Sequence, residues 1–484
     1  MNLRAVAAGI ALLVFTISVI GIVVGAVGLY YAFTGGGPRE FSTALKFVAL
    51  YSIAALLSLP VVLGFRRVQT GITEGFVIIA ASWLILPLVS SFSYMASVGF
   101  SFVDAYFESI SGFTGTGLTV IARPQDMPRT VLLWRAVTQW IGELGVVVIS
   151  GTFLPLLHRV IKGIYEVERG ARIAPTVIAT TRRLFTIYVV FTVVSTVILV
   201  AGGMNLFDAV THSMTAIATG GFSTRSESIG YWRWSHVVVV GTMAISIIGA
   251  FNFADNDLLL RGRFRELLSS SELRWFLALL TVVTLATGGA YVLFEKGTDP
   301  LTAFYVGVYH AISGMTTTGF QIDDLSHTAD QIKIMLIVGM VIGGCTFSTA
   351  GGLKIKRVAL AIKNVVWEAA SYFTPPTMML RRRLGKEPVD DAYMRSVYNF
   401  MFVYITTLTI ISVAVSMLGY RFIDSLFEVA SALSCVGLSV GITSMSAPLA
   451  VKLLLIAAMY LGRIEFLPLY MAVGRLYVRK LRVV

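Results

Sequence analysis

The sequence predicts an all-α polytopic membrane protein in which four parallel repeats follow two extra N-terminal transmembrane helices. Three observations lead to this fold class. The 484 residues are 56% hydrophobic and 13% charged, with a mean hydropathy of +0.81, which lies outside the usual range of soluble globular proteins. Ten apolar runs are long enough to cross a bilayer core of about 30 Å as helices. A glycine-bearing motif recurs four times, which indicates internal repeats.

The ten apolar runs define the expected spans in chain order. They cover approximately residues 5–33, 42–64, 73–93, 130–157, 181–202, 235–256, 273–294, 332–350, 395–418 and 449–474. The first run begins like a signal peptide at Leu3-Arg4, but its apolar core is longer than the roughly 7–15 residues of such a peptide, and no small-residue cleavage site ends it. We therefore interpret it as a retained span.

Charge asymmetry orients these spans. With the N-terminus inside, the loops after the even-numbered spans are basic, whereas the other loops carry acidic residues and fewer cations. The positive-inside rule therefore places the basic loops and both termini in the cytoplasm. The net charge of +12 follows mostly from this topology, and it does not indicate nucleic-acid binding, because the cations lie in several short loops without interleaved aromatic residues. The longest basic segment, about 355–394, is a candidate cytosolic hairpin or docking surface.

Four segments align on one glycine, and each has an amphipathic stretch before it that is too short to cross the bilayer. The aligned segments are DAYFESISGFTGTGL (Asp104–Leu118), DAVTHSMTAIATGGF (Asp208–Phe222), VGVYHAISGMTTTGF (Val306–Phe320) and DSLFEVASALSCVGL (Asp424–Leu438). Each lies on the outside between two spans, so the repeat unit is span, short re-entrant helix, glycine loop, span. The expected divisions of the chain are 1–68 (extra spans), 69–172 (repeat 1), 173–265 (repeat 2), 266–393 (repeat 3) and 394–484 (repeat 4).

These repeats predict a pore with pseudo-fourfold symmetry. Two spans and a re-entrant loop return the chain to its starting side, so the four units run the same way and can surround one axis. Non-helical backbone at membrane depth persists only where it is buried in protein or lines a cavity. A ring of carbonyl groups meets this condition, because it can replace the hydration shell of a monovalent cation, and glycine allows the positive φ that turns carbonyls inward. Close helix packing is the alternative role of such residues, but four copies at one offset favour a pore.

The candidate filter residues are the four positions that end at each aligned glycine. They are Thr114, Gly115, Thr116 and Gly117; Ala218, Thr219, Gly220 and Gly221; Thr316, Thr317, Thr318 and Gly319; and Ser434, Cys435, Val436 and Gly437. The hydroxyl groups among them can brace or supplement the carbonyl ring. The side chains differ between the repeats, so the strength of any ion selectivity is not fixed by this pattern.

A second candidate element is IGGCTFSTAGGLKIKR (Ile342–Arg357), which interrupts an apolar span with small and polar residues. The spacing of a phosphate-binding loop is absent, so nucleotide binding is not indicated. A broken helix beneath the filter can instead place polar backbone across the ion path; a merely kinked helix is the alternative. The expected hinges are Gly343, Gly344, Gly351 and Gly352, and the expected ion-facing groups are Ser348 and Thr349.

With these motifs in view, the chain resembles the superfamily of potassium transporters that includes TrkH, TrkG, KtrB and the plant HKT proteins. The segments QWIGELGVVVISGTFLPLL (Gln139–Leu157) and GRIEFLPL (Gly462–Leu469) are also similar to second spans of this family, and the two extra N-terminal spans favour its TrkH side. The resemblance implies potassium uptake through a filter of the four glycine loops, since glycine in all four goes with potassium in this family. K⁺ is then the bound ion, with no transition metal and no organic cofactor.

The resemblance also implies partners and a gate. It implies a homodimer in the cell membrane of a prokaryote, a gating loop at about 343–352, and control by a separate cytosolic TrkA-type ring with nucleotide-binding RCK domains. Arg463 corresponds to an arginine near that gate, where a buried positive charge can raise the barrier to cations. Glu143 stands where the family usually has glycine, and we hypothesise that it offsets Arg463 and lowers this barrier. The alternative is a purely structural ion pair of Arg463 with Glu143 or Glu465.

Four polar residues stand nine positions before the aligned glycines. They are Glu108, His212, His310 and Glu428. Two histidines and two carboxylates can suggest a metal site, but these residues come early on short helices whose C-terminal ends should point at the ion. We therefore expect them to make structural hydrogen bonds.

Two further groups carry weaker signals. Asp255 and Asp257 either attract cations at an inner rim or belong to a solvated surface. Cys345 and Cys435 lie in or beside apolar spans and do not suggest a disulfide framework.

Two classes of function remain open. One is a gated potassium channel or channel-like uptake protein, and the other is a secondary transporter that couples potassium to sodium or protons; the same filter can serve both. An enzyme is not expected, because no serine–histidine, paired-aspartate or His-Glu metal motif occurs on the spans at a workable spacing.

Overall fold

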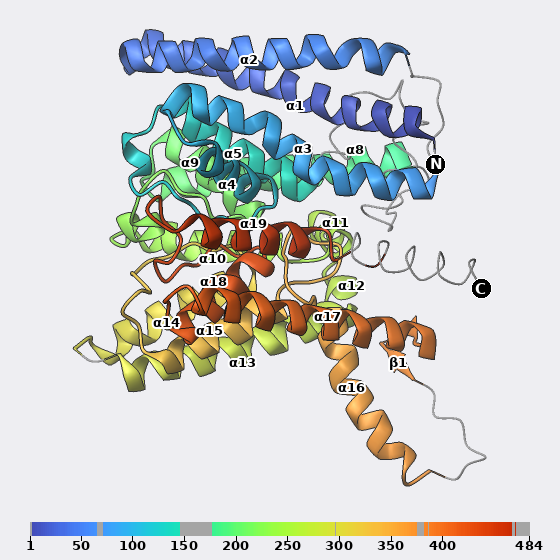
Figure 1. Cartoon of the computed structure of the whole chain (residues 1–484). Coiled ribbons are helices and arrows are strands. Elements are labelled where there is room, and N and C mark those ends of the chain that lie inside the picture. Colours follow the sequence, from blue (N-terminus) through green and yellow to red (C-terminus); the bar gives the residue numbers. More distant parts are fainter. Residues whose placement is uncertain are drawn as a thin grey trace.

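The computed structural model describes residues 2–64, 71–145, 177–295, 297–374, 382–385, 387–466 and 470. Within these ranges the regular structure is helical, apart from a hairpin of two short strands, β1 (Arg383–Leu384) and β2 (Glu387–Pro388). The long helices run side by side in a bundle, and one helix projects away from it (Figure 1). This arrangement agrees with the predicted all-α fold class.

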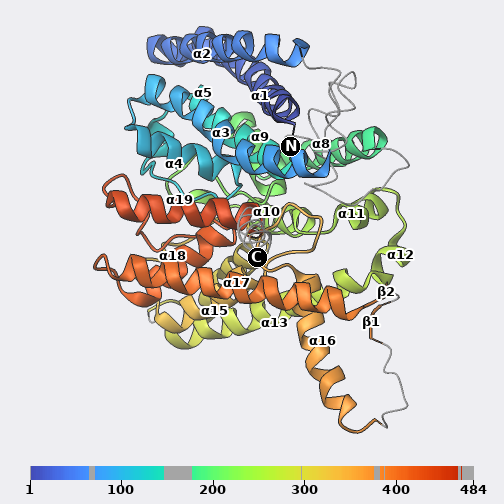
Figure 2. The same cartoon turned by 45° about the vertical axis from the view of Figure 1, so that its right-hand side comes forward.

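A helical hairpin at the N-terminus lines one edge of the bundle (Figures 1 and 2). Its elements are α1 (Leu3–Tyr31), the π-helical turn η1 (Ala32–Gly36) and α2 (Gly37–Gly64). The buried carboxylate of Glu40 in α2 accepts hydrogen bonds from the backbone N–H groups of Arg129 at 2.7 Å and Thr130 at 2.8 Å. These N–H groups begin another helix, whose positive end favours a carboxylate. Glu40 therefore fastens the hairpin to the rest of the protein.

After this hairpin, one order of elements recurs four times: a long helix, a short helix, a loop and a second helix. The four sets are α3 (Ile72–Val98), α4 (Phe102–Phe113) and α5 (Arg129–Leu144); α8 (Val177–Ala201), α9 (Leu206–Ile217) and α10 (His236–Gly249); α13 (Ser271–Phe294), α14 (Pro300–Met315) and α15 (Asp330–Ile342); and α17 (Asp391–Ser416), α18 (Phe422–Leu433) and α19 (Leu449–Arg463). This is the element order of the predicted repeat unit, and the sets are called repeats 1 to 4 below.

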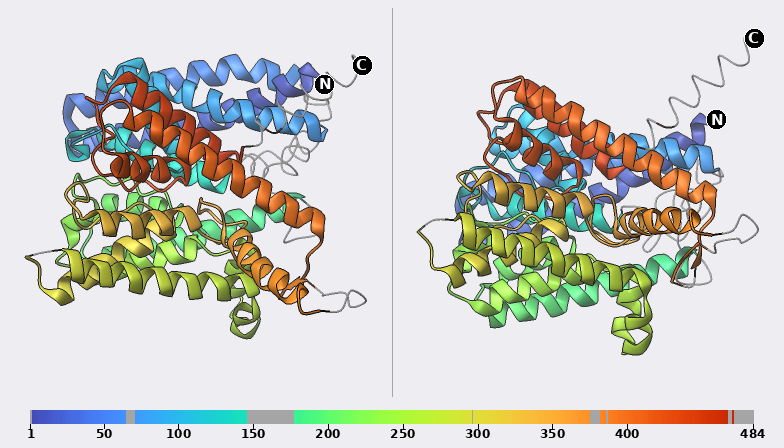
Figure 3. Two further views of the ribbon diagram at one scale, coloured as in Figure 1. Left: turned by 60° about the horizontal axis from the view of Figure 1, so that its bottom comes forward. Right: turned by 90° about the horizontal axis from the view of Figure 1, so that it is seen from below.

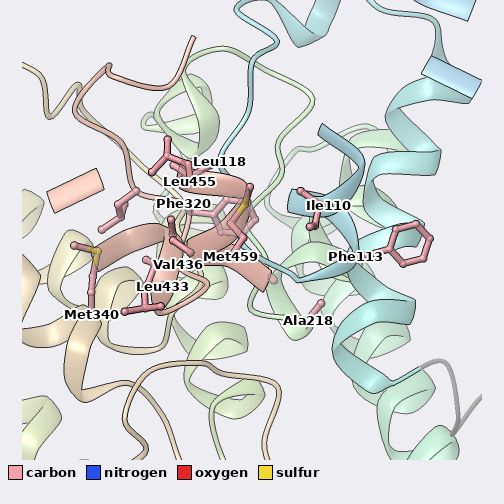
Figure 4. Close-up of a cluster of buried hydrophobic side chains, with 14 of the residues drawn as sticks. Ile110, Phe113, Leu118, Ala218, Phe320, Met340, Leu433, Val436, Leu455 and Met459 are labelled. Atoms are coloured by element: carbon pink, nitrogen blue, oxygen red, sulfur yellow. The ribbon is translucent and has the colours of Figure 1, made fainter. Parts of the chain in front are cut away.

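The second helix of each repeat packs against the short helix of the next repeat. The contacts are α5 on α9, α10 on α14, α15 on α18 and α19 on α4, so the four repeats close into a ring. Figure 3 shows the first and fourth repeats side by side, although they are far apart in the sequence. Buried side chains from all four repeats meet inside this ring, among them Ile110, Ala218, Phe320 and Leu433 (Figure 4).

The remaining elements lie between the repeats. They are η2 (Pro124–Asp126), η4 (Ser228–Trp232), α11 (Phe253–Leu260), α12 (Phe264–Ser269) and α16 (Ile355–Ser371). Helix α16 is the one that projects from the bundle in Figures 1 and 2, and the β1–β2 hairpin follows it. The predicted cytosolic segment 355–394 is thus a helix and a hairpin, of which residues 375–381 and 386 lie outside the described residues.

The second helices are shorter than the sequence predicted. They contain 16, 14, 13 and 15 residues, so at 1.5 Å per residue each extends about 24 Å or less. A continuous helix over 235–256 is wrong, because α10 ends at Gly249, whereas the end of α15 at Ile342 agrees with the interruption predicted for Ile342–Arg357. Helix α19 likewise ends at Arg463. The part of the predicted span 130–157 beyond Gly145 lies outside the described residues.

These short helices change the count of candidate spans. Ten were expected, whereas the described residues contain five helical stretches that are long and apolar enough, the first of which, Leu3–Gly64, comprises α1 and α2. The count is six if α10 and α11, bent by 117° at their junction, form one broken span. Hydropathy did not reveal these ends because the apolar composition continues past them.

Close backbone packing explains three of the helix ends. A Cβ atom on Gly142, Gly249 or Gly462 would lie within 3.0 Å of the carbonyl oxygen of the last residue of a short helix. The three oxygens belong to Phe113, Ile217 and Leu433 respectively. Glycine allows this approach, and the chain leaves the helix within a few residues of it.

Candidate ion pathway

The four aligned glycines meet in one closed cycle of contacts. Each has a positive φ, between +75° and +99°, a conformation that glycine adopts readily and other residues do not. A Cβ atom on any of them would lie within 3.0 Å of a carbonyl oxygen in the next repeat. The pairs are Gly117 with Gly220, Gly221 with Thr318, Gly319 with Val436, and Gly437 with Thr116. The structure therefore brings the four predicted loops together, and both conformation and space require glycine at these positions.

The backbone before each glycine follows the same course in all four repeats. In each repeat, the second residue after the short helix has a positive φ. These residues are Gly115 (+69°), Thr219 (+48°), Thr317 (+56°) and Cys435 (+54°). The next N–H group then returns to the short helix. These bonds are Thr116 to Ser111 (3.0 Å), Gly220 to Thr215 (2.8 Å), Thr318 to Ser313 (2.9 Å) and Val436 to Ser431 (2.8 Å). Because the N–H and C=O of a trans peptide point in opposite directions, the preceding carbonyl oxygens point away from the short helices.

Hydroxyl groups brace this backbone in two of the repeats. The Oγ1 atoms of Thr114 and Thr116 are 2.8 Å apart, and so are those of Thr316 and Thr318. In each pair the first hydroxyl also donates to a carbonyl group of the short helix at 2.7 Å. Repeat 4 has a different contact, in which Ser434 Oγ lies 2.6 Å from the hydroxyl of Tyr404. The hydroxyls thus lie behind the loops in bonds to protein groups.

Repeat 2 has Ala218 and Gly220 at the positions of the hydroxyl pair. Its loop is instead contacted by a side chain of repeat 1. The side-chain amide of Gln139, on α5, donates from Nε2 to the carbonyl oxygen of Gly220 at 2.5 Å and accepts from the N–H of Phe222 at 3.0 Å. Gln139 is fully buried. Gln139 was not among the predicted site residues, although an amide side chain inside an apolar span is a signal of a specific polar contact.

Four polar side chains hold the chain where it leaves the glycines. Glu108 accepts from Val120 N–H (3.1 Å), His212 Nε2 lies 2.9 Å from Ser223 Oγ, Ile322 N–H donates to His310 Nε2 (3.3 Å), and Glu428 accepts from Val440 N–H (3.1 Å). All four side chains are fully buried. In the described part of the chain, no group of three or more His, Cys, Asp or Glu residues could hold a metal. These contacts are the structural hydrogen bonds that were expected.

One of these carboxylates belongs to a buried ion pair between repeats. Arg135, on α5, donates from Nε to Glu108 at 2.7 Å and from Nη1 to the carbonyl oxygen of Ser223 at 3.0 Å. Its guanidinium lies over the ring of Phe222, 4.0 Å from the centroid. If either contact were lost, a buried charge would be left without its partner, which is costly. Arg135 therefore fixes the loop of repeat 2 relative to repeat 1.

The segment between α15 and α16 runs directly against the glycine loops. Gly351 N–H donates to Thr317 Oγ1 at 2.7 Å, and a Cβ atom on Gly351 would lie within 3.0 Å of the carbonyl oxygen of Ser434. Thr349 Oγ1 donates to the carbonyl oxygen of Gly249 at 2.8 Å and lies 3.2 Å from Thr219 Oγ1. This segment, residues 343–354, therefore contacts the loops of repeats 2, 3 and 4.

The predicted hinge glycines of this segment are tightly packed. Gly343 and Gly352 have φ values of +72° and +78°. A Cβ atom on either glycine would lie within 3.0 Å of the backbone of the other. Gly344 packs against Ala350 and Ala250. Ser348 Oγ donates to the carbonyl oxygen of Cys345 at 2.6 Å. The segment is thus a compact loop, which agrees with the predicted interruption of the helix and not with the alternative of a merely kinked helix.

Glu272 ties this loop to the first helix of repeat 3. Its carboxylate accepts from the N–H of Thr346 at 2.6 Å and from the hydroxyl of the same residue at 2.8 Å. Asn252, in the bend between α10 and α11, also donates to it at 3.5 Å. Glu272 is buried, and a hydrogen bond to a charged group is stronger than a neutral one. Glu272 was not among the predicted site residues, because it belongs to none of the repeated motifs.

Arg463 is the last residue of α19, not a residue in the middle of a continuous span. Its Nη1 lies 2.5 Å from Glu143 Oε2, and its Nη2 donates to the carbonyl oxygen of Gly142 at 2.6 Å. Glu143 is therefore an ion-pair partner of Arg463, while Glu465 pairs with Arg357. A Cβ atom on Gly115 would lie within 3.0 Å of the Glu143 carboxylate. Glu143 thus joins Arg463 to the glycine loop of repeat 1.

A cavity of about 660 Å³ adjoins the glycine loops and the segment 343–354. Its lining includes Cys435 from the loop of repeat 4 and Ser348. Its charged lining residues are Glu272, Lys354, Lys356, Arg357, Glu387, Arg463 and Glu465. Three of the four cationic side chains are paired, Lys356 with Glu387, Arg357 with Glu465 and Arg463 with Glu143, so most of the charge that faces the cavity is compensated.

The remaining candidates are engaged elsewhere. Asp257 is paired with Arg183 through Nε at 2.6 Å and with Arg261 at 2.8 Å, and Asp255 accepts from Ser270 at 3.2 Å. Both aspartates are buried, so they do not form a solvated rim. Cys345 and Cys435 are buried free cysteines.

Together these features define a class of protein: a membrane transport protein whose four re-entrant loops meet at one point, above a loop that interrupts one of its helices. The sequence matches the TrkH family, described as cation transport protein, over residues 45–476. The chain belongs to this family.

Individual relatives agree with this assignment. The chain is 31% identical to the Trk system potassium uptake protein TrkG of Escherichia coli, over 83% of this chain and 84% of the relative. It is 30% identical to TrkH of the same organism, over 96% and 97%. The crystal structure of the potassium transporter TrkH from Vibrio parahaemolyticus matches with a TM-score of 0.84 and 24% identity, over 97% and 98%. The predicted fold class and family resemblance are confirmed, and the family consists of membrane transporters and not of enzymes.

Proposed function

We propose that this chain is the ion-translocating, channel-like subunit of a Trk-type potassium uptake system. The observation that carries the proposal is the closed cycle in which each aligned glycine meets a carbonyl group of the next repeat. Carbonyl oxygens that point away from the four short helices can replace the hydration shell of a monovalent cation. The filter ring then consists of residues 114–117, 218–221, 316–319 and 434–437. The names of the relatives, which are potassium uptake proteins, support K⁺ as the ion.

The segment 343–354 acts as an intramembrane gate in this proposal. It belongs to one repeat, yet it contacts the filter ring of three repeats, and it borders the cavity. The glycine hinges at 343, 344, 351 and 352 allow its backbone to rearrange. Opening in this proposal separates Thr349 from Gly249 and frees its hydroxyl for the ion path, and the hydroxyl of Ser348 becomes available only if it also leaves the carbonyl group of Cys345.

Arg463 and Glu143 set the electrostatic barrier below the filter ring. A buried positive charge near the path of a cation raises the barrier, and an adjacent carboxylate offsets it. The 2.5 Å ion pair and the contact of Glu143 with Gly115 support this part of the proposal. The positions equivalent to Gly115 in the other repeats are Thr219, Thr317 and Cys435. Glycine at position 115 leaves space for the Glu143 carboxylate, which a larger side chain would occupy.

A secondary transporter that couples potassium to sodium or proton entry remains the alternative.

The proposal further includes a homodimer in the plasma membrane, with both termini in the cytoplasm and a separate cytosolic TrkA-type nucleotide-binding ring as the regulator. The Trk system named for the relatives supports the separate regulator, and the exposed end of α16, where Tyr372 and Phe373 are largely exposed, offers contact surface.

The test is ion flux into liposomes that contain the purified chain, with wild type compared with Gly117→Ser. Wild type should carry K⁺ in preference to Na⁺ down an imposed gradient, and its reversal potential should not depend on sodium or pH. The serine side chain would collide with the carbonyl group of Gly220, so the variant should lose this preference. Sodium-selective flux in the wild type would contradict the filter, and a reversal potential that depends on sodium or protons would favour the coupled transporter.

A further inference from the structure

The four loops of the filter ring are not braced in the same way. Repeats 1 and 3 have a pair of threonine hydroxyls behind the loop, and repeat 4 has the contact between Ser434 and Tyr404. Repeat 2 reads Ala218-Thr219-Gly220, so it has neither side chain of the hydroxyl pair. The hydroxyl of Thr219 is directed to Thr349 in the segment 343–354. The loop of repeat 2 therefore lacks the hydroxyl pair, although Thr215 of its short helix donates to the carbonyl oxygen of Phe222 at 2.9 Å.

Gln139 occupies the space that this difference leaves. The three atoms nearest to a Cβ built on Gly220 all belong to the Gln139 amide group. That amide bonds the carbonyl oxygen of Gly220 and the N–H of Phe222, which flank Gly221 on both sides. One planar amide thus spans the filter glycine of repeat 2 and fixes both of its neighbouring peptides.

We propose that Gln139 is a positioning residue for ion selectivity, supplied by repeat 1 to the filter loop of repeat 2. This inference rests on the proposed function, since it assigns a role within the filter ring. Gln139 stands three residues before Gly142, and the residues three positions before Gly249 and Gly462, which make the same backbone contact in repeats 2 and 4, are Ser246 and Met459. Among these positions only the one in α5 carries an amide, and it lies next to the loop in which both residues of the hydroxyl pair are absent.

The experiment compares Gln139→Met with Gln125→Met in liposomes. Gln125 offers a matched control, because its amide also joins repeats 1 and 2: Nε2 donates to Ser226 Oγ at 3.3 Å and Oε1 accepts from Ser226 N–H at 3.1 Å. That link is exposed and remote from the filter ring. We expect the K⁺/Na⁺ flux ratio to fall about tenfold in Gln139→Met, the scale expected when buried polar groups lose their partners, and to stay at the wild-type value in Gln125→Met.

A second variant guards against misfolding. Gln139→Glu keeps the size of the side chain and an acceptor for Phe222 N–H, but it loses the donor to Gly220 and should also lower the ratio. The ratio is measured in each variant that elutes from a sizing column like the wild type. A wild-type ratio in either variant would overturn the assignment. No potassium preference in the wild type itself would instead overturn the proposed function, so the two failures are distinguishable.

Replacing the Gln139 amide by a pair of threonine hydroxyls tests the positioning role directly. A side chain that only fills space would not be replaced in this way. In a Gln139→Ala background, Ala218→Thr and Gly220→Thr together give repeat 2 the threonine pattern of repeat 3, and removal of the amide opens the space next to Gly220. We expect this triple variant to recover at least half of the selectivity lost in Gln139→Ala. A triple variant as unselective as Gln139→Ala would show that the amide does not stand in for a hydroxyl pair.

Discussion

The filter ring is built differently from the region where the second helices end, which is called the inner half of the bundle after the proposed topology. In the ring, the four repeats have equivalent backbone conformations and meet through glycine and carbonyl groups. In the inner half, each repeat differs: α10 bends into α11, the segment 343–354 interrupts repeat 3, and Arg463 at the end of repeat 4 binds Glu143 of repeat 1. The proposed function accounts for this difference: four repeats that contact one ion need equivalent groups, whereas a gate needs only one element that moves. Symmetry is therefore kept at the ring and lost below it.

The largest expected effect comes from breaking the ring itself. Gly221→Ala should abolish selective K⁺ uptake into liposomes, because its Cβ atom would press on the carbonyl oxygen of Thr318. The positive φ of +75° adds a conformational cost of about 1–2 kcal/mol. The matched control is Gly99→Ala, which has a φ of +76° but no atom within 4 Å of its Cβ position. If Gly221→Ala kept its selectivity, backbone contact at the ring would not determine the choice of ion.

The next effect tests the charge pair that links two repeats below the ring. Glu143→Gln removes the negative charge beside Arg463 and should slow K⁺ uptake about tenfold, which corresponds to about 1.4 kcal/mol of added barrier. Arg463→Gln should speed uptake, and the double variant should lie near the wild type. Initial rates for all four proteins test whether the two effects on the barrier add, in which case the double variant returns to the wild-type rate and the coupling energy is close to zero. Unchanged flux and thermal stability in Glu143→Gln would leave the pair without a role.

A smaller effect is expected at the anchor of the gate. Glu272→Gln replaces a charged acceptor with a neutral one at Thr346, and a hydrogen bond to a charged group contributes about 1.5–3 kcal/mol. The segment 343–354 should open more often, so K⁺ flux should rise severalfold while the K⁺/Na⁺ ratio stays constant. Glu266→Gln is the control, since Glu266 is exposed and pairs with Arg263 outside the loop. A change in the ratio would mean that the loop and the filter ring are not separate elements.

The same contrast explains what the sequence could predict. The ring was predictable because its signal is repeated: four glycines at one offset stand where the backbone needs a positive φ and a close neighbour. Gln139 and Glu272 occur once, in single contacts between segments far apart in the chain, so no internal comparison marks them. The ends of the second helices were mispredicted for a related reason. Gly142 and Gly462 stop their helices through packing on another backbone, and hydropathy does not record such contacts.

The smallest effect concerns the link between the gate and the segment that follows it. Lys356, in the first turn of α16, pairs with Glu387 of the hairpin at 2.7 Å, and the carboxylate is largely exposed. Exposed pairs of this kind contribute about 0–1 kcal/mol, so Glu387→Gln should leave both K⁺ flux and thermal stability close to the wild type. The contact of Arg357 with Glu465 and with the ring of Phe400 at 4.0 Å holds the same helix more firmly. A large change in flux from Glu387→Gln alone would therefore mean that the hairpin moves the gate directly, and that the asymmetry of the inner half extends to the end of α16.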